Sequence, residues 1–229
     1  MPPLLGPETF ILPLLNGIEA PAELAAAVGA PRVLGGLCTL ISYLVAPGEI
    51  RTLRAAGGLQ FGELDNQRST RVQQLEALCQ RAENVNVEVP PNIQAAMWQK
   101  FCIIAPWSGL GAVTRAPIGM FRSQPETREL LRRAIQEVYD VARATQIDLA
   151  PEIVQQTIER LDKVAVEGTA SMQRDIMAER PSELEAQSGA VVRYGAAVGV
   201  ATPVHQFIYA TLLPLERRAR GQLQWAPIE

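Results

Sequence analysis

Lys100 is the residue whose type and position indicate chemistry most directly. The chain contains nineteen arginines but only two lysines, Lys100 and Lys163. Because arginine stays protonated, a lysine in such a composition can supply an amine that gives up a proton near neutral pH. Lys100 falls within the apolar stripe of a helix predicted over residues 92–105, where an unpaired ammonium is costly. Two interpretations stay open, a proton donor and a lysine whose stem reaches solvent at a domain seam.

Three polar residues are further candidates for a ligand site. Asn16 ends an apolar run, and its amide can donate to or accept from a ligand carbonyl or hydroxyl, although Asn-Gly is also a favourable turn. Glu183 lies in the first turn of a predicted helix, where the helix dipole commonly favours carboxylates. Ser171, in the segment TASMQRD, is explained equally well by a helix start. Each residue therefore has a structural explanation beside the functional one.

The elements expected before Pro90 are strands joined by short helices. Residues 9–15 predict a strand, followed by a turn at Asn16-Gly17 and a helix in EAPAELAAAVG. Residues 32–53 predict strands that are broken at Ala46-Pro47-Gly48. Two further strands are expected over residues 59–64 and 84–89, with a helix over residues 69–82 between them.

From Pro90 onward the pattern is almost entirely helical. Two series recur at the spacing of one helix face: Leu130, Leu131, Ala134, Ile135, Val138, Val141 and Ala142, then Ile153, Val154, Ile158, Leu161 and Val164. Ser182 and Glu185 match a capping box, in which Glu185 would reach back to the Ser182 amide. Thr202-Pro203 predicts another helix start, and we expect His205 in its first turn to lie on the surface.

The glycine-rich loop that opens a dinucleotide-binding domain is missing from this sequence. In such a domain a GxGxxG turn places the pyrophosphate on a helix N-terminus. The 229 residues contain no GxGxxG, and Gly35-Gly36 and Gly57-Gly58 are better interpreted as strand-edge or turn glycines. The sequence thus predicts an α/β part over residues 1–90, the second half of a Rossmann-like domain, followed by an all-helical domain over residues 91–229.

Composition argues against several classes of function. A formal net charge of -3 and a pI near 5.4 give no basic excess for nucleic acid or an anionic membrane surface. Three cysteines without a CxxC indicate neither a disulfide framework nor a metal site. No apolar run approaches a membrane span and the N-terminus has no basic leader, so we expect a cytoplasmic protein.

Several segments together resemble ketopantoate reductases, in the order and close to the spacing typical of that family. They are LPLLNGIE, RVLGGLCTLIS, FGELD, AAMWQKF, ASMQRDIMAERPSELEAQSGAVVRYG and GVATPV. The resemblance implies an N-terminal Rossmann domain, an all-helical C-terminal domain for substrate binding and homodimer formation, and an active site in the cleft between them. It also implies an oxidoreductase that reduces 2-dehydropantoate to (R)-pantoate with NADPH, in pantothenate and coenzyme A synthesis.

The same resemblance implies roles for individual residues. Lys100 corresponds to the general acid and Glu183 to the active-site carboxylate. Asn16 corresponds to the residue near the nicotinamide and the substrate, and is thus a candidate for cofactor as well as substrate binding. Ser171 corresponds to a substrate contact.

The sequence departs from the family where asparagines usually follow the lysine. Ile104 and Ser108 occupy two of those positions and Ile118 a third; Ser108 is kept as a substrate-binding candidate. Each lost amide leaves a polar substrate group unpaired, at a cost of about 1–3 kcal/mol. The alternatives are therefore a related 2-oxo acid reductase with a different substrate, and a non-catalytic remnant that lost cofactor binding.

Overall fold

The chain folds into two compact units in a computed structural model that describes residues 4–40, 42–52 and 57–225. Unit 1 comprises Met1–Leu15 and Glu19–Met97, and unit 2 comprises Asn16–Ile18 and Trp98–Glu229. The division falls inside one long helix, α3 (Ile93–Thr114). A functional boundary at Pro90-Pro91 stays a prediction.

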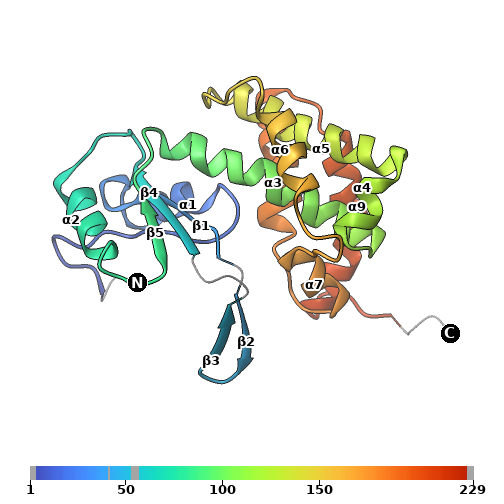
Figure 1. Cartoon of the computed structure of the whole chain (residues 1–229), viewed down its shortest axis with the longest axis horizontal. Coiled ribbons are helices and arrows are strands. Elements are labelled where there is room, and N and C mark those ends of the chain that lie inside the picture. The colour runs from blue at the N-terminus through green and yellow to red at the C-terminus, as the bar shows by residue number, and fades with distance from the viewer. Residues whose placement is uncertain (1–3, 41, 53–56, 226–229) are drawn as a thin grey trace. The chain divides into compact units, whose positions relative to one another are not determined.

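Unit 1 is built on a three-stranded sheet in the order β1-β4-β5 (Figure 1). β1 (Leu34–Cys38) pairs antiparallel with β4 (Gly57–Glu63), and β4 pairs parallel with β5 (Val85–Glu88). β2 (Ser42–Ala46) and β3 (Glu49–Thr52) form a separate antiparallel hairpin. Its turn uses Gly48 at φ 79°, a conformation that glycine adopts without steric cost. β4 and β5 confirm the strands expected over residues 59–64 and 84–89.

The helices of unit 1 lie where the sequence predicted them. α1 (Ala20–Val28) ends at Gly29, and a short 3-10 turn, η2 (Ala30–Arg32), leads into β1. α2 (Thr70–Cys79) begins with Ser69, whose hydroxyl accepts from the Val72 amide. Buried Leu34, Phe61 and Val72 form the core between α2 and the sheet.

The strand predicted over residues 9–15 does not form. Only Ile11 makes an isolated parallel bridge, to Val33. Pro13 has no amide hydrogen for a ladder, and Leu15 is 70% exposed, so neither pairing nor burial continues the strand. Asn16 therefore follows an extended segment and does not close a sheet strand.

Unit 2 is helical. Its elements are the second part of α3, α4 (Ile118–Ser123), α5 (Pro125–Ala144), α6 (Ile153–Asp162), α7 (Ser171–Met177), a π-helix η3 (Glu185–Gly189), α8 (Ala190–Val198) and α9 (Pro203–Ala219). The apolar face of α5 is buried as predicted, except that Leu130 is 40% exposed. α3 continues through Pro106 and ends at Thr114, nine residues beyond its expected end at residue 105. Buried Cys102, Ala105 and Leu110 hold this part of the helix in the core.

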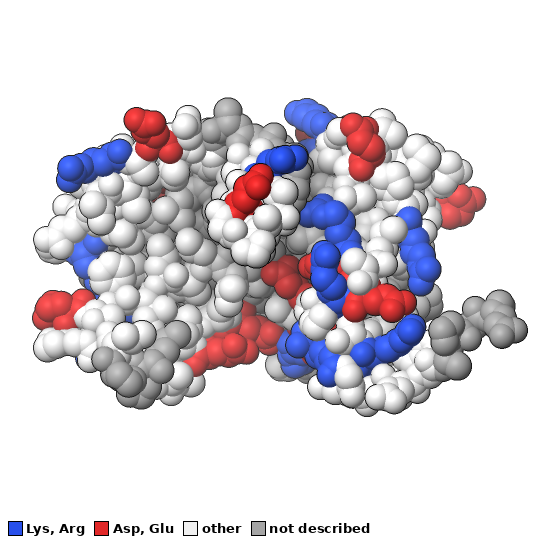
Figure 2. Space-filling model, turned by 90° about the horizontal axis from the view of Figure 1, so that it is seen from below, with Lys and Arg blue, Asp and Glu red and all other residues white. Residues whose placement is uncertain are grey.

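Several exposed charges of opposite sign are paired in the described part of the chain, for example Arg128 with Asp162 and Arg132 with Glu129. Figure 2 accordingly shows basic side chains beside acidic ones on the face it presents. Among the described residues, no helix has both the length and the apolar character needed to cross a membrane. The same residues include no cluster of three His, Cys, Asp or Glu side chains suited to a metal ion.

Candidate active site

Asn16 and Glu183, 167 positions apart in the sequence, are in direct contact within unit 2. Asn16 Nδ2 donates to both carboxylate oxygens of Glu183, at 3.2 Å to Oε1 and 3.0 Å to Oε2. The next residue, Gly17, has φ 99°, and a Cβ there would lie 2.7 Å from the Ala186 carbonyl oxygen. Glycine therefore allows the Asn16 turn to approach the segment that carries Glu183.

Gln187 is a third member of this group that sequence reasoning missed. Its Nε2 donates to Glu183 Oε2 at 2.9 Å, and its side chain is buried. Residues four apart on a helical turn face one another, so the spacing from Glu183 is a signal that could have identified Gln187. In the described part of the chain, the side-chain hydrogen bonds of Glu183 come from these two neutral amides. Among the described residues, these two amides are the groups that orient the carboxylate.

The segment that carries Glu183 is not capped as predicted. The Ser182 hydroxyl does accept from the Leu184 amide, but the Ser182 amide donates to both oxygens of Glu216, each at 3.1 Å. Glu185 turns outward to Arg193 and Tyr209. The prediction of a capping box was wrong because Glu216, only 2% exposed, accepts from the Ser182 amide that Glu185 was expected to bind.

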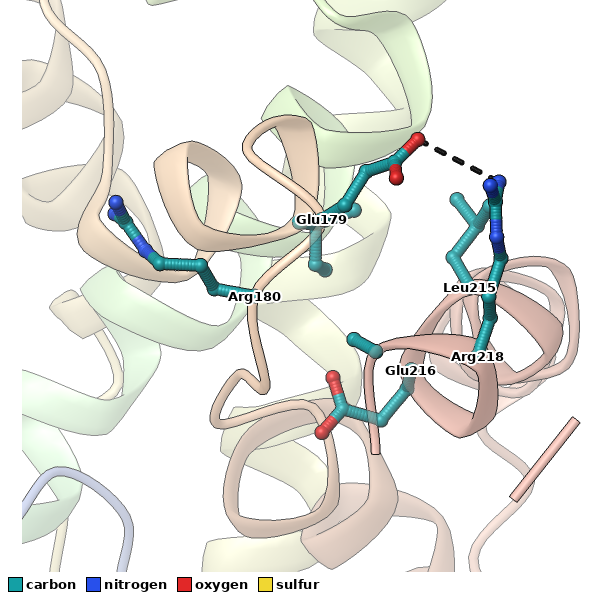
Figure 3. A pocket seen from close by; sticks show the side chains of 7 residues that line it. Glu179, Arg180, Leu215, Glu216 and Arg218 are labelled. Carbon is teal, nitrogen blue, oxygen red and sulfur yellow. Dashed lines mark hydrogen bonds and ion pairs between the residues drawn. The ribbon is translucent and has the colours of Figure 1, made fainter. Parts of the chain in front are cut away.

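A small pocket of about 160 Å³ lies beside this capping arrangement (Figure 3). The turn after α7 contributes Glu179 and Arg180, while α9 contributes Leu215, Glu216 and Arg218. Its charged groups already have partners: Glu179 with Arg218, Arg180 with Asp175, and Glu216 with Arg220. Of these pairs, Glu179–Arg218 joins the turn after α7 to α9, which gives the pocket a structural role.

His205 is buried, which corrects its expected surface position. Its ring is fully enclosed, with Nε2 3.1 Å from the Ala134 carbonyl and Nδ1 3.4 Å from the Ser188 hydroxyl. Burial lowers the pKa of His205 to about 4, against the smaller opposing effect of the Ala134 carbonyl. Because Nε2–H donates to a carbonyl, neutral Nδ1 accepts from Ser188. The ring thereby fixes the position of Ser188 within η3.

The start of α9 is also satisfied differently from the prediction. Pro203 takes the first helical position as expected, but the Thr202 side chain makes no capping hydrogen bond. Glu137 of α5 instead accepts from the Val204 amide at 2.7 Å and the His205 amide at 2.9 Å. Burial raises the pKa of Glu137, and these two backbone donors oppose the rise.

The other predicted site residues lie on α3 and α7. Lys100 is half-buried on α3, Ser108 on the same helix is buried, and Ser171 is exposed as the first residue of α7. Neither serine is hydrogen-bonded to Glu183 or Asn16 in the described structure. Trp107, two helical turns after Lys100 on the same side of α3, has a buried indole N–H without a hydrogen-bond partner among the described residues.

The glycines of unit 1 do not form a cradle for a cofactor pyrophosphate. Gly35 and Gly36 lie within β1, where a Cβ would come within 3.0 Å of Ile93 and 2.9 Å of the Pro13 carbonyl, respectively. They provide room for the protein's own packing, and they lie in an edge strand of the sheet, as the strand-edge interpretation expected. Gly35 and Gly36 therefore do not fit the phosphate end of a dinucleotide.

Comparison with known proteins gives a consistent family. The model of the ketopantoate reductase PanE/ApbA C-terminal domain matches residues 92–216, and the ketopantoate reductase PanE/ApbA model matches residues 1–66. A 2-dehydropantoate 2-reductase of Nostoc sp. is 28% identical over 229 residues, covering 97% of this chain and 71% of the relative.

Two solved structures show the same fold. A 2-dehydropantoate 2-reductase from Methylococcus capsulatus is 31% identical, with a TM-score of 0.84 over 94% of this chain and 68% of that one. A D-mandelate dehydrogenase, solved with NADH and anilino(oxo)acetate, has a TM-score of 0.84 at 22% identity, over 95% of this chain and 70% of that one.

Proposed function

The chain belongs to the ketopantoate reductase PanE/ApbA family of oxidoreductases, and from this premise we propose that it reduces 2-dehydropantoate to (R)-pantoate with NADPH. The observation that carries the proposal is the contact of Asn16 with Glu183, because it unites two residues that are far apart in sequence and individually ambiguous. Relatives named 2-dehydropantoate 2-reductase support the substrate. The reaction would belong to pantothenate and coenzyme A synthesis.

In this proposal a nicotinamide, when bound, would supply the hydride for the ketone carbon, and the protein's own residues would provide charge and orientation. Lys100 gives a proton to the oxygen that becomes the alcohol. Glu183 accepts a hydrogen bond from the substrate, held in place by the Asn16 and Gln187 amides. Since the described glycines do not cradle a pyrophosphate, the cofactor rests on the family relationship and not on residues of unit 1.

A second candidate is a reductase for a different 2-oxo acid. Ile104, one turn after Lys100 and half-buried, adds an apolar surface to α3. An apolar side chain suits a substrate with an apolar group there better than one that needs an amide partner. A panel of 2-oxo acids distinguishes the two candidates by their kcat/KM.

The test is the consumption of NADPH by the purified protein with 2-dehydropantoate and with that panel. We expect Glu183→Gln to lower kcat/KM about 10- to 100-fold, because a hydrogen bond to a charged group is lost. Glu185→Gln is the matched control, since Glu185 is exposed two positions away and pairs with Arg193. Absence of both NADPH binding and turnover of any 2-oxo acid would favour the non-catalytic alternative, and equal activity of the two variants would remove Glu183 from the site.

A further inference from the structure

The amide of Gln187 is satisfied at one end only. The side chain is 1% exposed, and Nε2 donates to Glu183 Oε2 at 2.9 Å. Oε1 is buried and has no hydrogen-bond partner among the described residues. Exchanging the two ends would set a carbonyl oxygen against the Glu183 carboxylate, so the hydrogen bond to Glu183 fixes which end is unpaired.

A second buried glutamine shows what a purely structural amide looks like in this unit. Gln173 of α7 is also fully enclosed, but its Nε2 donates to the Ala116 carbonyl at 2.9 Å and its Oε1 accepts from the Ala170 amide at 3.3 Å. Buried acceptors in folded proteins almost always have a donor. Among the described residues only Trp107 Nε1 and Thr157 Oγ1 share this condition, and neither is bonded to Glu183, so the Gln187 oxygen calls for a donor from elsewhere.

The position of this oxygen is set by Glu183. Adding the width of an amide group to the 2.9 Å hydrogen bond places Gln187 Oε1 within about 5 Å of Glu183 Oε2. Both groups only accept hydrogen bonds at this point, and Glu183 is oriented by neutral amides. A ligand group that approaches these two acceptors must therefore bring a hydrogen-bond donor.

We propose that Gln187 Oε1 accepts a hydrogen bond from a hydroxyl group of the bound 2-oxo acid, and that Gln187 thereby selects hydroxylated 2-oxo acids over their deoxy analogues. The proposal rests on the proposed function, because it assigns a specificity residue to that reaction. A substrate without the hydroxyl leaves the oxygen buried and unpaired, which is the situation in which enzymes discriminate most strongly.

The test uses two substrates that differ by one hydroxyl, 2-dehydropantoate and 3,3-dimethyl-2-oxobutanoate. Gln187→Met keeps the length of the side chain and removes the acceptor, and Gln187→Leu is a second variant should the first fold poorly. We expect the ratio of kcat/KM for the two substrates to fall about 10- to 100-fold in the variant. Gln173→Met, the matched control, should leave the ratio unchanged while lowering stability.

A loss of activity that is equal for both substrates would overturn the proposal, because Gln187 would then act only by orienting Glu183. Failure of the parent protein to reduce either compound would instead contradict the proposed function. In that case calorimetric binding of pantoate and of 2-hydroxy-3,3-dimethylbutanoate replaces turnover. Preferential binding of pantoate that Gln187→Met abolishes supports the inference; equal binding, or no binding, overturns it.

Discussion

His205 makes the stability of unit 2 depend on pH in a way that can be calculated. It is the only histidine in the chain, so a single imidazole is involved. Its folded pKa of about 4 lies below the ordinary 6.5 because burial disfavours the charged ring. Between these values the unfolded state binds more protons than the folded state. The free energy of unfolding is therefore highest above about pH 6.5 and falls as the pH is lowered toward 4.

The size of the effect follows from the difference of about 2.5 pKa units. One unit corresponds to about 1.4 kcal/mol, so the full loss approaches about 3 kcal/mol. Between about pH 7.5 and pH 5, most of the unfolded imidazole and little of the folded one becomes protonated, and the expected loss is about 2 kcal/mol. Glu137 has the opposite sign, since its raised folded pKa makes its contribution fall as the pH rises above 4.5.

Urea unfolding followed by tryptophan fluorescence measures this loss in unit 2, because Trp98, Trp107 and Trp225 all belong to that unit. His205→Gln removes the imidazole and keeps Glu137, so the difference in pH dependence between the two proteins isolates His205. We expect the variant to be less stable at neutral pH but to lack the loss of about 2 kcal/mol on acidification. If both proteins lose the same stability, or if NMR shows the imidazole titrating near pH 6.5 in the folded protein, the reasoning is refuted.

Two further substitutions test the proton donor and the support of the Glu183 segment. Lys100→Arg keeps the positive charge but cannot give up a proton, so kcat should fall about 10²- to 10⁴-fold, as for Lys100→Ala. The control Lys163→Arg, at an exposed site, should leave kcat unchanged. A near-parental kcat in Lys100→Arg would exclude the acid role. Glu216→Gln should lower the free energy of unfolding of unit 2 by about 2–4 kcal/mol, because it weakens the hydrogen bonds from Ser182 and Arg220. The control Glu179→Gln, at the rim of the pocket, should lower it by under about 1 kcal/mol. Equal effects of the two substitutions would contradict a capping role for Glu216.

Local patterns predicted the elements well where packing agreed with them. The apolar series of α5 and α6 identified both helices, because one buried face is enough to stabilise each. The same local rules failed at Pro13, which interrupts an otherwise strand-like run, and at Pro106, which α3 passes through. In each case the outcome depends on which neighbouring residues pack there, and those neighbours are distant in the sequence.

The arrangement around Glu183 could be predicted only in part. Asn16 and Glu183 were identified by resemblance, while their residue types alone also fitted a turn and a helix start. His205 was misplaced because its partners, Ala134 and Ser188, lie 71 and 17 positions away. Glu185 matched a capping box, yet Glu216 takes the donor from 34 positions further along the chain. Sequence spacing recognises a local hydrogen bond but not a distant competitor for it.

The misplaced residues share one structural consequence, which is that the Glu183 segment is fixed on both sides. Glu216 binds the amide of Ser182, immediately before Glu183, and the His205 ring meets Ser188, five positions after it. Between these points the chain makes a π-helical turn, with the Gly189 amide bonded to the Leu184 carbonyl, a feature often found at functional sites. A carboxylate on a segment restrained in this way loses little freedom when a ligand binds. Protonation of His205 at low pH would therefore weaken the segment's restraint together with the stability of unit 2, because the same ring serves both.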